Sequence, residues 1–146
     1  MRIYIPALLT DLQRYVDEAI VPVRGGTAFA LTPTLREHYV SGDDEELEHI
    51  AFQDAARASL RLLSGAAGDP VPVGAAARKR VVISADVDDV LVTCRPDLDL
   101  AVVRLADDSV AARTVAAVHV DLDMAADAVA AAVAVIGAAD LGDEAV

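Results

Sequence analysis

Hydrophobic and polar residues alternate along several short segments of the chain, as they do in strands whose successive side chains point to opposite sides. This period of two, or a short apolar run between turn residues, predicts strands at 2–5, 27–31, 80–87, 100–105 and 115–122. Pro6 follows the first segment and is expected to end it. Residues 90–93 fit either a short edge strand or a turn of helix, and both alternatives stay open.

A helical period is clearest between residues 44 and 63. With about 100° of rotation per residue, the apolar positions form one stripe along this segment: Leu47, Ala51, Ala55, Ala58 and Leu62. Asp43 is a good N-cap, acidic residues fill the first turn, and Gly65 is a stop signal. The pattern predicts a long amphipathic helix whose alanines allow close approach to a core.

Shorter helices are predicted at about 11–20, after Pro33, and at about 124–138. Thr10 and Gln13 form a capping-box pattern before the first of them, and Asp123 is the expected cap of the last.

The order of these elements indicates the fold class. An early strand–helix–strand unit followed by consecutive strands predicts an α+β fold with a mixed β-sheet. Helices are expected mainly on one face of that sheet, among them the long helix at 44–63. We expect residues 1–146 to form a single domain, with 65–78 as a surface loop and 140–146 as a flexible acidic tail.

Composition adds a core of small side chains and an acidic surface. Of the 146 residues, 55% are hydrophobic but only 3% aromatic, so alanine and valine dominate the predicted core. The formal net charge of −12 repels the phosphates of nucleic acids and anionic membranes. We therefore expect no nucleic acid and no membrane as partner, and instead a protein or a small ligand.

The expected location is the cytoplasm. Cys94 is the only cysteine, which excludes an internal disulfide and favours a reducing compartment. The apolar run 3–9 is short and lacks a preceding basic region, so it does not resemble a secretion signal. Alanine excess and a single lysine, Lys79, suggest a GC-rich bacterial genome.

Polar side chains on the predicted strands are the first candidate site. The chain has none of the P-loop, dinucleotide-binding, GxSxG, HExxH or CxxC motifs. Alternation places these polar residues opposite apolar ones: Arg2, Tyr4, Ser84, Asp86, Arg104, His119 and Asp121. In one sheet they would converge on the face without helices. Such a face either binds a small anion or supports acid–base chemistry, or it is polar simply because water covers it.

Glu48 is the second candidate, because it falls inside the apolar arc of the long helix, beside Ser59. A carboxylate that faces a core needs a partner, and an arginine is expected; otherwise its pKa rises. Glu48 is then either a buried acid at a site, or part of a structural salt bridge or a helix edge that reaches water.

Metal ligation is disfavoured, and no metal or cofactor is expected. The chain has two incomplete pairs of ligand types: His119 with Asp121, and Glu46 with His49. The basic run 78–80 is expected to pair with neighbouring carboxylates rather than hold a phosphate.

Five segments follow one another in a distinctive order over roughly residues 1–125: RIYIPA at the N-terminus, TAFALTPTLREHY, DDEELEHIAFQDAARASLRLL, RVVISADV and AAVHVDLD. Together they resemble a family of uncharacterised small proteins from actinobacteria. The long helix carries the most specific part of the resemblance. The resemblance implies a cytoplasmic actinobacterial protein and transfers no activity and no catalytic residue.

The sequence therefore favours a non-catalytic binding or accessory protein of unknown function. The alternative is a small enzyme without a cofactor that acts on a polar or anionic small molecule. Its catalytic candidates are His119, Asp121 and Glu48, and its ligand-binding candidates are Arg2, Tyr4 and Arg104. A homodimer formed through an apolar patch is a third reading.

Overall fold

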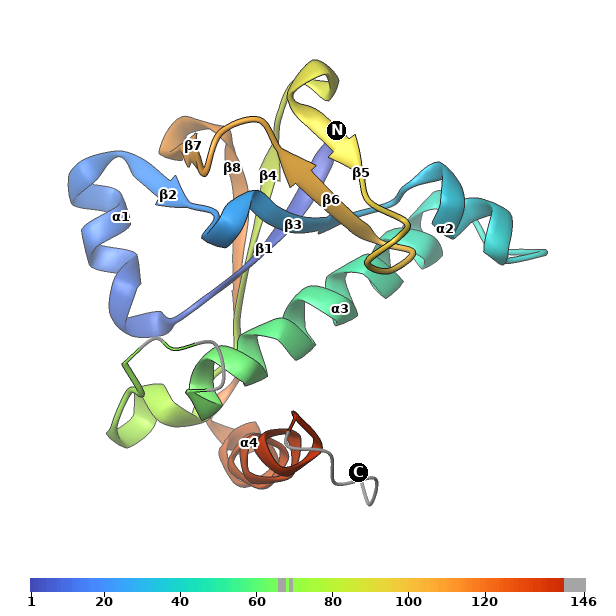
Figure 1. The fold of residues 1–146 in the computed structure, drawn as a ribbon. Coiled ribbons are helices and arrows are strands. Elements are labelled where there is room, and N and C mark those ends of the chain that lie inside the picture. The colour runs from blue at the N-terminus through green and yellow to red at the C-terminus, as the bar shows by residue number, and fades with distance from the viewer. Residues whose placement is uncertain (66–67, 69, 141–146) are drawn as a thin grey trace.

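The computed structural model describes residues 1–65, 68 and 70–140 (Figure 1). At its centre is a six-stranded sheet with the strand order β5-β6-β3-β1-β4-β8. Its strands are β1 (Arg2–Ala7), β3 (Thr27–Ala30), β4 (Val81–Asp86), β5 (Val92–Cys94), β6 (Val102–Leu105) and β8 (Val115–Val120). The predicted α+β class is confirmed. Each neighbouring pair is antiparallel, however, so the sheet is not mixed in strand direction.

The difference arises at β2 (Ile20–Pro22), which leaves the sheet and pairs with β7 (Ser109–Ala111) in a separate two-stranded ribbon. The helix α1 (Leu12–Glu18) therefore does not connect parallel neighbours, and β1 pairs antiparallel with β3. Both ribbon strands have only three residues. Such short segments carry too little alternation to be predicted from sequence.

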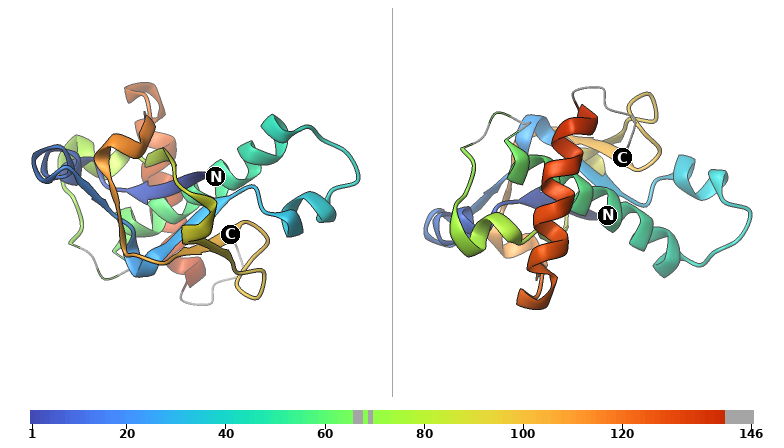
Figure 2. Two further views of the ribbon diagram at one scale, coloured as in Figure 1. Left: turned by 90° about the horizontal axis from the view of Figure 1, so that it is seen from above. Right: turned by 90° about the horizontal axis from the view of Figure 1, so that it is seen from below.

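Each face of the sheet is covered by different elements. The first face carries a dry cluster that also includes residues of α1 and the ribbon: Ile3, Ile5, Tyr15, Val21, Val81, Ile83 and Val103. On the second face, α2 (Pro33–His38) and α3 (Asp44–Ser64) contribute to a cluster with Tyr4 and Val82. The helix α4 (Ala126–Asp140) crosses α3 on the side away from the sheet (Figure 2).

The long helix α3 begins and ends where the sequence predicts. The side chain of Asp43 accepts a hydrogen bond from the backbone N–H of Glu46, and Gly65 adopts a left-handed conformation with φ of 79°. Ser59 is 0% exposed and connects the helix to the sheet. Its hydroxyl donates to the carbonyl of Ala7 and accepts from the N–H of Val81, both at 3.0 Å.

Pro6 does not end β1, contrary to expectation, because it lies where the ladder is one-sided. Pairing of β1 with β3 is recorded only at Ile3 and Tyr4, whereas pairing with β4 continues to Ala7. A residue without an N–H is tolerated where one side of the strand has no partner.

Two further local predictions are wrong, and the segment 65–78 contains a helical turn. No side chain caps α1, so the capping box expected at Thr10 and Gln13 is not formed. Asp123 forms an ion pair with Lys79 rather than capping the last helix. The expected loop 65–78 ends in a short 3₁₀ helix over Gly74–Arg78.

Residues 90–93 contain both predicted alternatives, because a 3₁₀ turn over Asp89–Leu91 leads into β5. The acidic tail lies outside the described residues beyond position 140.

Candidate functional site

The polar residues of β1, β4 and β8 share one face of the sheet, as the alternation predicts. Tyr4 is paired with Ser84, and Arg2 with Asp86. His119 is paired with Val82, two residues from Ser84 on the same strand face.

This face is not the one without helices, which corrects the prediction. Tyr4 is only 6% exposed and lies in the cluster of α3 residues that includes Ala51 and Ala55. Alanines at the contact let the helix approach the sheet closely, and Val82 and Phe29 supply apolar surface between the polar positions.

Phe52 of α3 is the centre of an aromatic group on this face. Its ring lies edge-to-face against Tyr4 at 5.9 Å and against His119 at 4.9 Å, measured between ring centroids. On the other side it stacks on His49 of the same helix at 5.9 Å. We call these four residues the aromatic cluster. Three elements far apart in sequence thus bring their rings together.

Two shallow depressions, both open to solvent, flank the aromatic cluster. One, of about 220 Å³, is lined by Arg2, Tyr4, Glu45, Glu48, His49, Phe52, Ser84 and His119, and we call it the carboxylate depression. The other, of about 430 Å³, lies towards Arg80 and Asp121 and also borders on His49, Phe52 and His119. Polar groups and aromatic rings are therefore exposed side by side at the edge of α3.

Glu48 finds its partner in a tyrosine rather than the expected arginine. The Tyr4 hydroxyl donates to Oε2 of Glu48 at 3.2 Å, and the Glu48 side chain is half-buried. Burial raises the pKa of Tyr4 to about 12, and the negative charge of Glu48 adds to this rise. Tyr4 therefore stays a neutral donor throughout the physiological pH range.

Ser84 and His119 form the second polar pair of the face. Their Oγ and Nε2 atoms are 3.1 Å apart. A serine beside a histidine resembles a nucleophile with its base. Ser84 is only 2% exposed, however, and no described carboxylate is hydrogen-bonded to His119. The pair thus lacks the third, orienting group of a catalytic triad.

Two arginines near the depressions are already engaged. Arg2 donates from Nε and a terminal nitrogen to Asp86, both at 2.8 Å, which lowers the pKa of Asp86. Arg80 makes the same two-pronged contact with Asp121 at 2.8 Å. Burial raises the pKa of Asp121, but the hydrogen bonds from Arg80 outweigh it and the pKa lies below its usual range. The predicted candidate Asp121 is thereby held in an ion pair.

Arg104 is the one sequence-predicted candidate that lies away from the others. It is on β6, paired with Thr27 of β3, so β3 separates its strand from β1. It shares the sheet face but does not line either depression. Four of the six candidates lie together around the carboxylate depression: Arg2, Tyr4, Glu48 and His119. Asp121 lines the neighbouring depression, and Arg104 lies apart from both.

The sequence profile of a family of unknown function (DUF6912) matches residues 1–146. The chain belongs to this family. Comparisons with curated proteins and with solved structures find no match. The predicted resemblance to an uncharacterised family is thus confirmed, and the match assigns no activity to the aromatic cluster.

In this member of the DUF6912 family, sequence reasoning missed three residues of the site. Phe52 was not among the candidates, His49 was considered only in an incomplete metal-ligand pair with Glu46, and Arg80 only as part of the basic run 78–80. A signal was present for the first two, because positions three apart on a helix are neighbours. The pairing of the basic run with carboxylates is confirmed: Arg78 with Asp127, Lys79 with Asp123, and Arg80 with Asp121.

Two kinds of feature are absent from the described part of this DUF6912 chain. Among those residues, no three histidine, cysteine or acidic side chains are grouped so that they could hold a metal ion. The described helices include none with the length and apolar character that crossing a membrane requires.

Proposed function

We propose that this protein is a non-catalytic binding protein and that its carboxylate depression takes a cationic group, an amine or a guanidinium. The observation that carries the proposal is the position of Glu45 and Glu48 beside the rings of Tyr4 and Phe52. A cation gains from a carboxylate and from the face of an aromatic ring together. The cation would belong to a small molecule or to a basic segment of a partner protein.

The charges around the depression favour a cation over an anion. The lining arginine, Arg2, is engaged by Asp86, and Glu45 forms no ion pair with any described residue. The net charge of −12 attracts a cationic partner from a distance and repels anions. An anion would also lack the second predicted arginine, since Arg104 lies outside the depression.

A small enzyme without a cofactor, acting on a polar or anionic molecule, is the second candidate. The Ser84–His119 contact favours it. Acyl transfer is the reaction class that fits a serine beside a histidine. The burial of Ser84 and the engagement of Asp121 by Arg80 make this candidate the weaker one.

We further propose that the protein works in the cytoplasm of an actinobacterium. The single cysteine, the scarcity of lysine and the acidic charge support this location and origin. The same charge supports a partner other than nucleic acid or an anionic membrane.

Thermal-shift measurements on the full chain test the binding proposal. The probes are spermidine and a short arginine-rich peptide as cations, and citrate and inorganic phosphate as anions. A ligand that binds only the native state raises the melting temperature. We expect both cations to raise it, and neither anion to do so.

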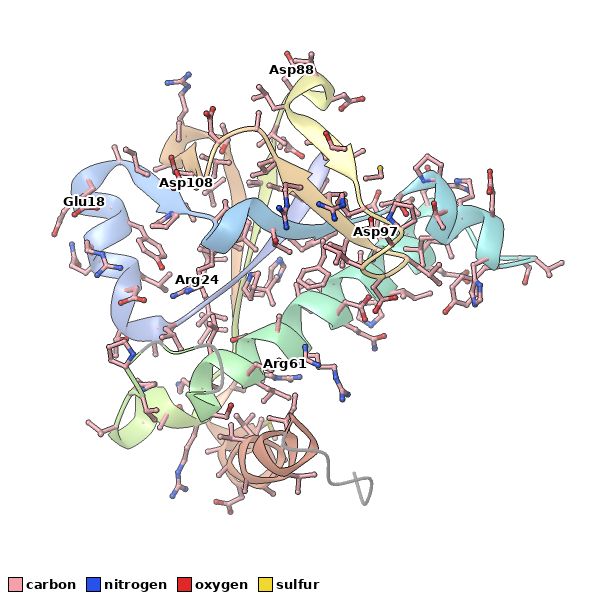
Figure 3. All side chains as sticks on the ribbon, in the orientation of Figure 1. Glu18, Arg24, Arg61, Asp88, Asp97 and Asp108 are labelled. Carbon is pink, nitrogen blue, oxygen red and sulfur yellow. The ribbon has the colours of Figure 1, made fainter. Side chains whose placement is uncertain are left out.

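Matched variants locate the effect. Glu48→Gln removes one negative charge from the carboxylate depression, and Glu18→Gln removes one at the exposed end of α1, far from α3 (Figure 3). Glu48→Gln should abolish most of the shift and Glu18→Gln should preserve it. An equal loss in both variants would mean non-specific attraction to an acidic surface, and a shift with anions alone would contradict the proposal.

The enzyme candidate has its own test. The enzyme candidate requires that the protein hydrolyse an activated acetate ester and that the activity be lost in Ser84→Ala and kept in Ser109→Ala, a serine of the distant ribbon. The binding proposal expects no hydrolysis that depends on Ser84. Ester turnover that depends on Ser84 would replace the binding proposal by the enzyme candidate.

A further inference from the structure

We propose that β8 is a dimerisation edge, on which a second copy of this chain adds its own β8 antiparallel. Two six-stranded sheets would then form one continuous sheet. This inference concerns the edge of the sheet and does not depend on what the carboxylate depression binds.

The first observation is that β8 is an open edge strand without the usual protection. It pairs with β4 on one side, and no described strand pairs with its other side. Four of its six residues are exposed. The sequence VAAVHV contains neither a formal charge nor a proline, although these are the devices that normally protect an edge.

One irregularity limits the pairing to part of the strand. The register shifts opposite Ser84 and Ala85, so that Ala116 is an extra residue in β8. Residues 117–120 remain regular and are available for an added strand.

The opposite edge of the sheet, at β5, has features that protect it against the addition of another strand. There, β5 is only three residues long. Asp88 lies before it and Asp97 lies after it (Figure 3), and Pro96 follows closely. A short strand between charges and a proline resists the addition of another strand. Of the two edges of the sheet, therefore, only the β8 edge lacks flanking protection of this kind.

The second observation is an exposed apolar strip that begins on β8. Val118 is 46% exposed and Val120 38%, and the strip continues beyond the strand with Leu122 at 68% and Met124 at 88%. Val118 and Val120 lie on the first face, because they pair with Ile83 and Val81. Exposed apolar residues in a row mark an interaction surface rather than an ordinary solvated one.

The third observation is that charge is balanced in this region, which identifies a second copy as the occupant. Residues 115–136 contain three carboxylates, Asp121, Asp123 and Asp127, and each is paired with a cation of the run 78–80. Residues 115–136 and the run 78–80 together therefore add nothing to the net charge of −12. Two equally acidic molecules repel each other, so they associate best through a neutral surface.

Geometry also fits a second copy. An antiparallel edge is complementary to itself, because a twofold axis perpendicular to the sheet brings each strand's free donors to the other's acceptors. That axis keeps the two first faces on the same side. The exposed apolar strips of the two copies, each starting at Val118 and Val120, would then meet on the first face of the joined sheet. The two His119 side chains would lie near each other on the second face.

The test measures the mass of the full chain in solution by light scattering after size-exclusion chromatography. We expect the unaltered protein to have twice the chain mass. The double variant Val118→Asp, Val120→Asp should have the mass of one chain, because charges on an edge strand prevent another strand from pairing with it. The control Val90→Asp, Leu91→Asp introduces the same two charges before β5, at residues 81% and 42% exposed, and should remain a dimer.

Hydrogen exchange on the unaltered protein gives a second measurement that no folding defect can affect. Those amides of residues 117–120 that point away from β4 should be protected in concentrated samples and lose this protection on dilution, in step with the mass. A monomer at all concentrations, a double variant that stays dimeric, or a dimer whose β8 amides exchange freely would each overturn the proposal.

Discussion

The two faces of the sheet are made from alternate residues of the same strands, yet they differ in almost every property. On β1, Ile3 and Ile5 lie in the dry first-face cluster, whereas Arg2 and Tyr4 lie on the second face. On β4, Ile83 belongs to the first face and Ser84 to the second. The first face carries a cluster of buried, mostly aliphatic side chains, and the second has hydrogen-bonded pairs beside aromatic rings.

The difference shows that a helix can cover a sheet face and still leave polar and aromatic side chains accessible along its edge. The helix α3 buries Tyr4 and Ser84 almost completely, but its exposed edge leaves His49, His119 and part of Phe52 in contact with solvent. At that boundary Tyr4 is hydrogen-bonded to Glu48 and Ser84 to His119. The first face supports stability, and the boundary of the second is where a ligand can make contact.

The largest expected effect is on the dry face. Ile5→Ala removes a side chain only 1% exposed and should lower the free energy of unfolding by about 2–5 kcal/mol. Phe52→Ala should cost less, because the ring is only partly buried. Urea unfolding of both variants measures the two values. A larger loss for Phe52→Ala would reverse the proposed division between the faces.

The next effect concerns the hydroxyl that connects α3 to the sheet. Ser59→Ala leaves the buried N–H of Val81 and the carbonyl of Ala7 without this partner and should cost about 1–3 kcal/mol. Ser41→Ala, at an exposed position before α3, is the control and should change stability by less than about 0.5 kcal/mol. Equal values in urea unfolding would show that Ser59 does not hold the helix.

A smaller effect is expected for the hydroxyl of Tyr4. Tyr4→Phe removes the hydrogen bond to Glu48 and should cost about 0.5–1.5 kcal/mol at neutral pH. Urea unfolding at pH 7 measures it. A variant as stable as the unaltered protein would mean that the contact contributes nothing.

The same variant predicts a pH dependence. The pKa of Tyr4 is raised to about 12, so above pH 10 the unfolded chain releases this proton while the folded protein keeps it. Stability should therefore fall between pH 10 and about 12, and less steeply in Tyr4→Phe. Tyr15, whose pKa burial also raises, is present in both proteins, so their difference isolates Tyr4. Parallel pH profiles would contradict the assignment.

The smallest expected effect is at the far end of the second face. Arg80→Met should change stability by about 1 kcal/mol or less, because the arginine is partly exposed. It should raise the pKa of Asp121, since the two side-chain hydrogen bonds that help to lower it are lost, while burial and the hydrogen bond from the backbone N–H of residue 80 remain. Titration of the Asp121 carboxyl by NMR measures this shift, and an unchanged or lower pKa would be inconsistent with the structure.

Local sequence signals predicted much of the fold. Asp43 and Gly65 mark the ends of α3 because caps act within one turn of the helix. The alternation on β1, β4 and β8 correctly groups Tyr4, Ser84 and His119, because a period of two is a property of the backbone.

Long-range features could not be predicted in this way. Alternation indicates which residues share a sheet face, but it does not indicate which face a helix covers. The second face was therefore expected to carry no helix. The pairing of Glu48 with Tyr4 depends on how α3 crosses β1, which no local signal encodes. The ribbon of β2 and β7 joins segments that are far apart in the sequence and only three residues long.

The most direct test of the central claim, that the boundary between α3 and β8 is the binding surface, is to map a bound cation by NMR. Spermidine is titrated into the unaltered protein while backbone and side-chain resonances are followed. We expect the shifts to gather at Glu45, Glu48, Phe52 and His119 and to be absent from α1 and the ribbon. Shifts centred on α1 or the ribbon, or spread evenly over the acidic surface, would contradict it.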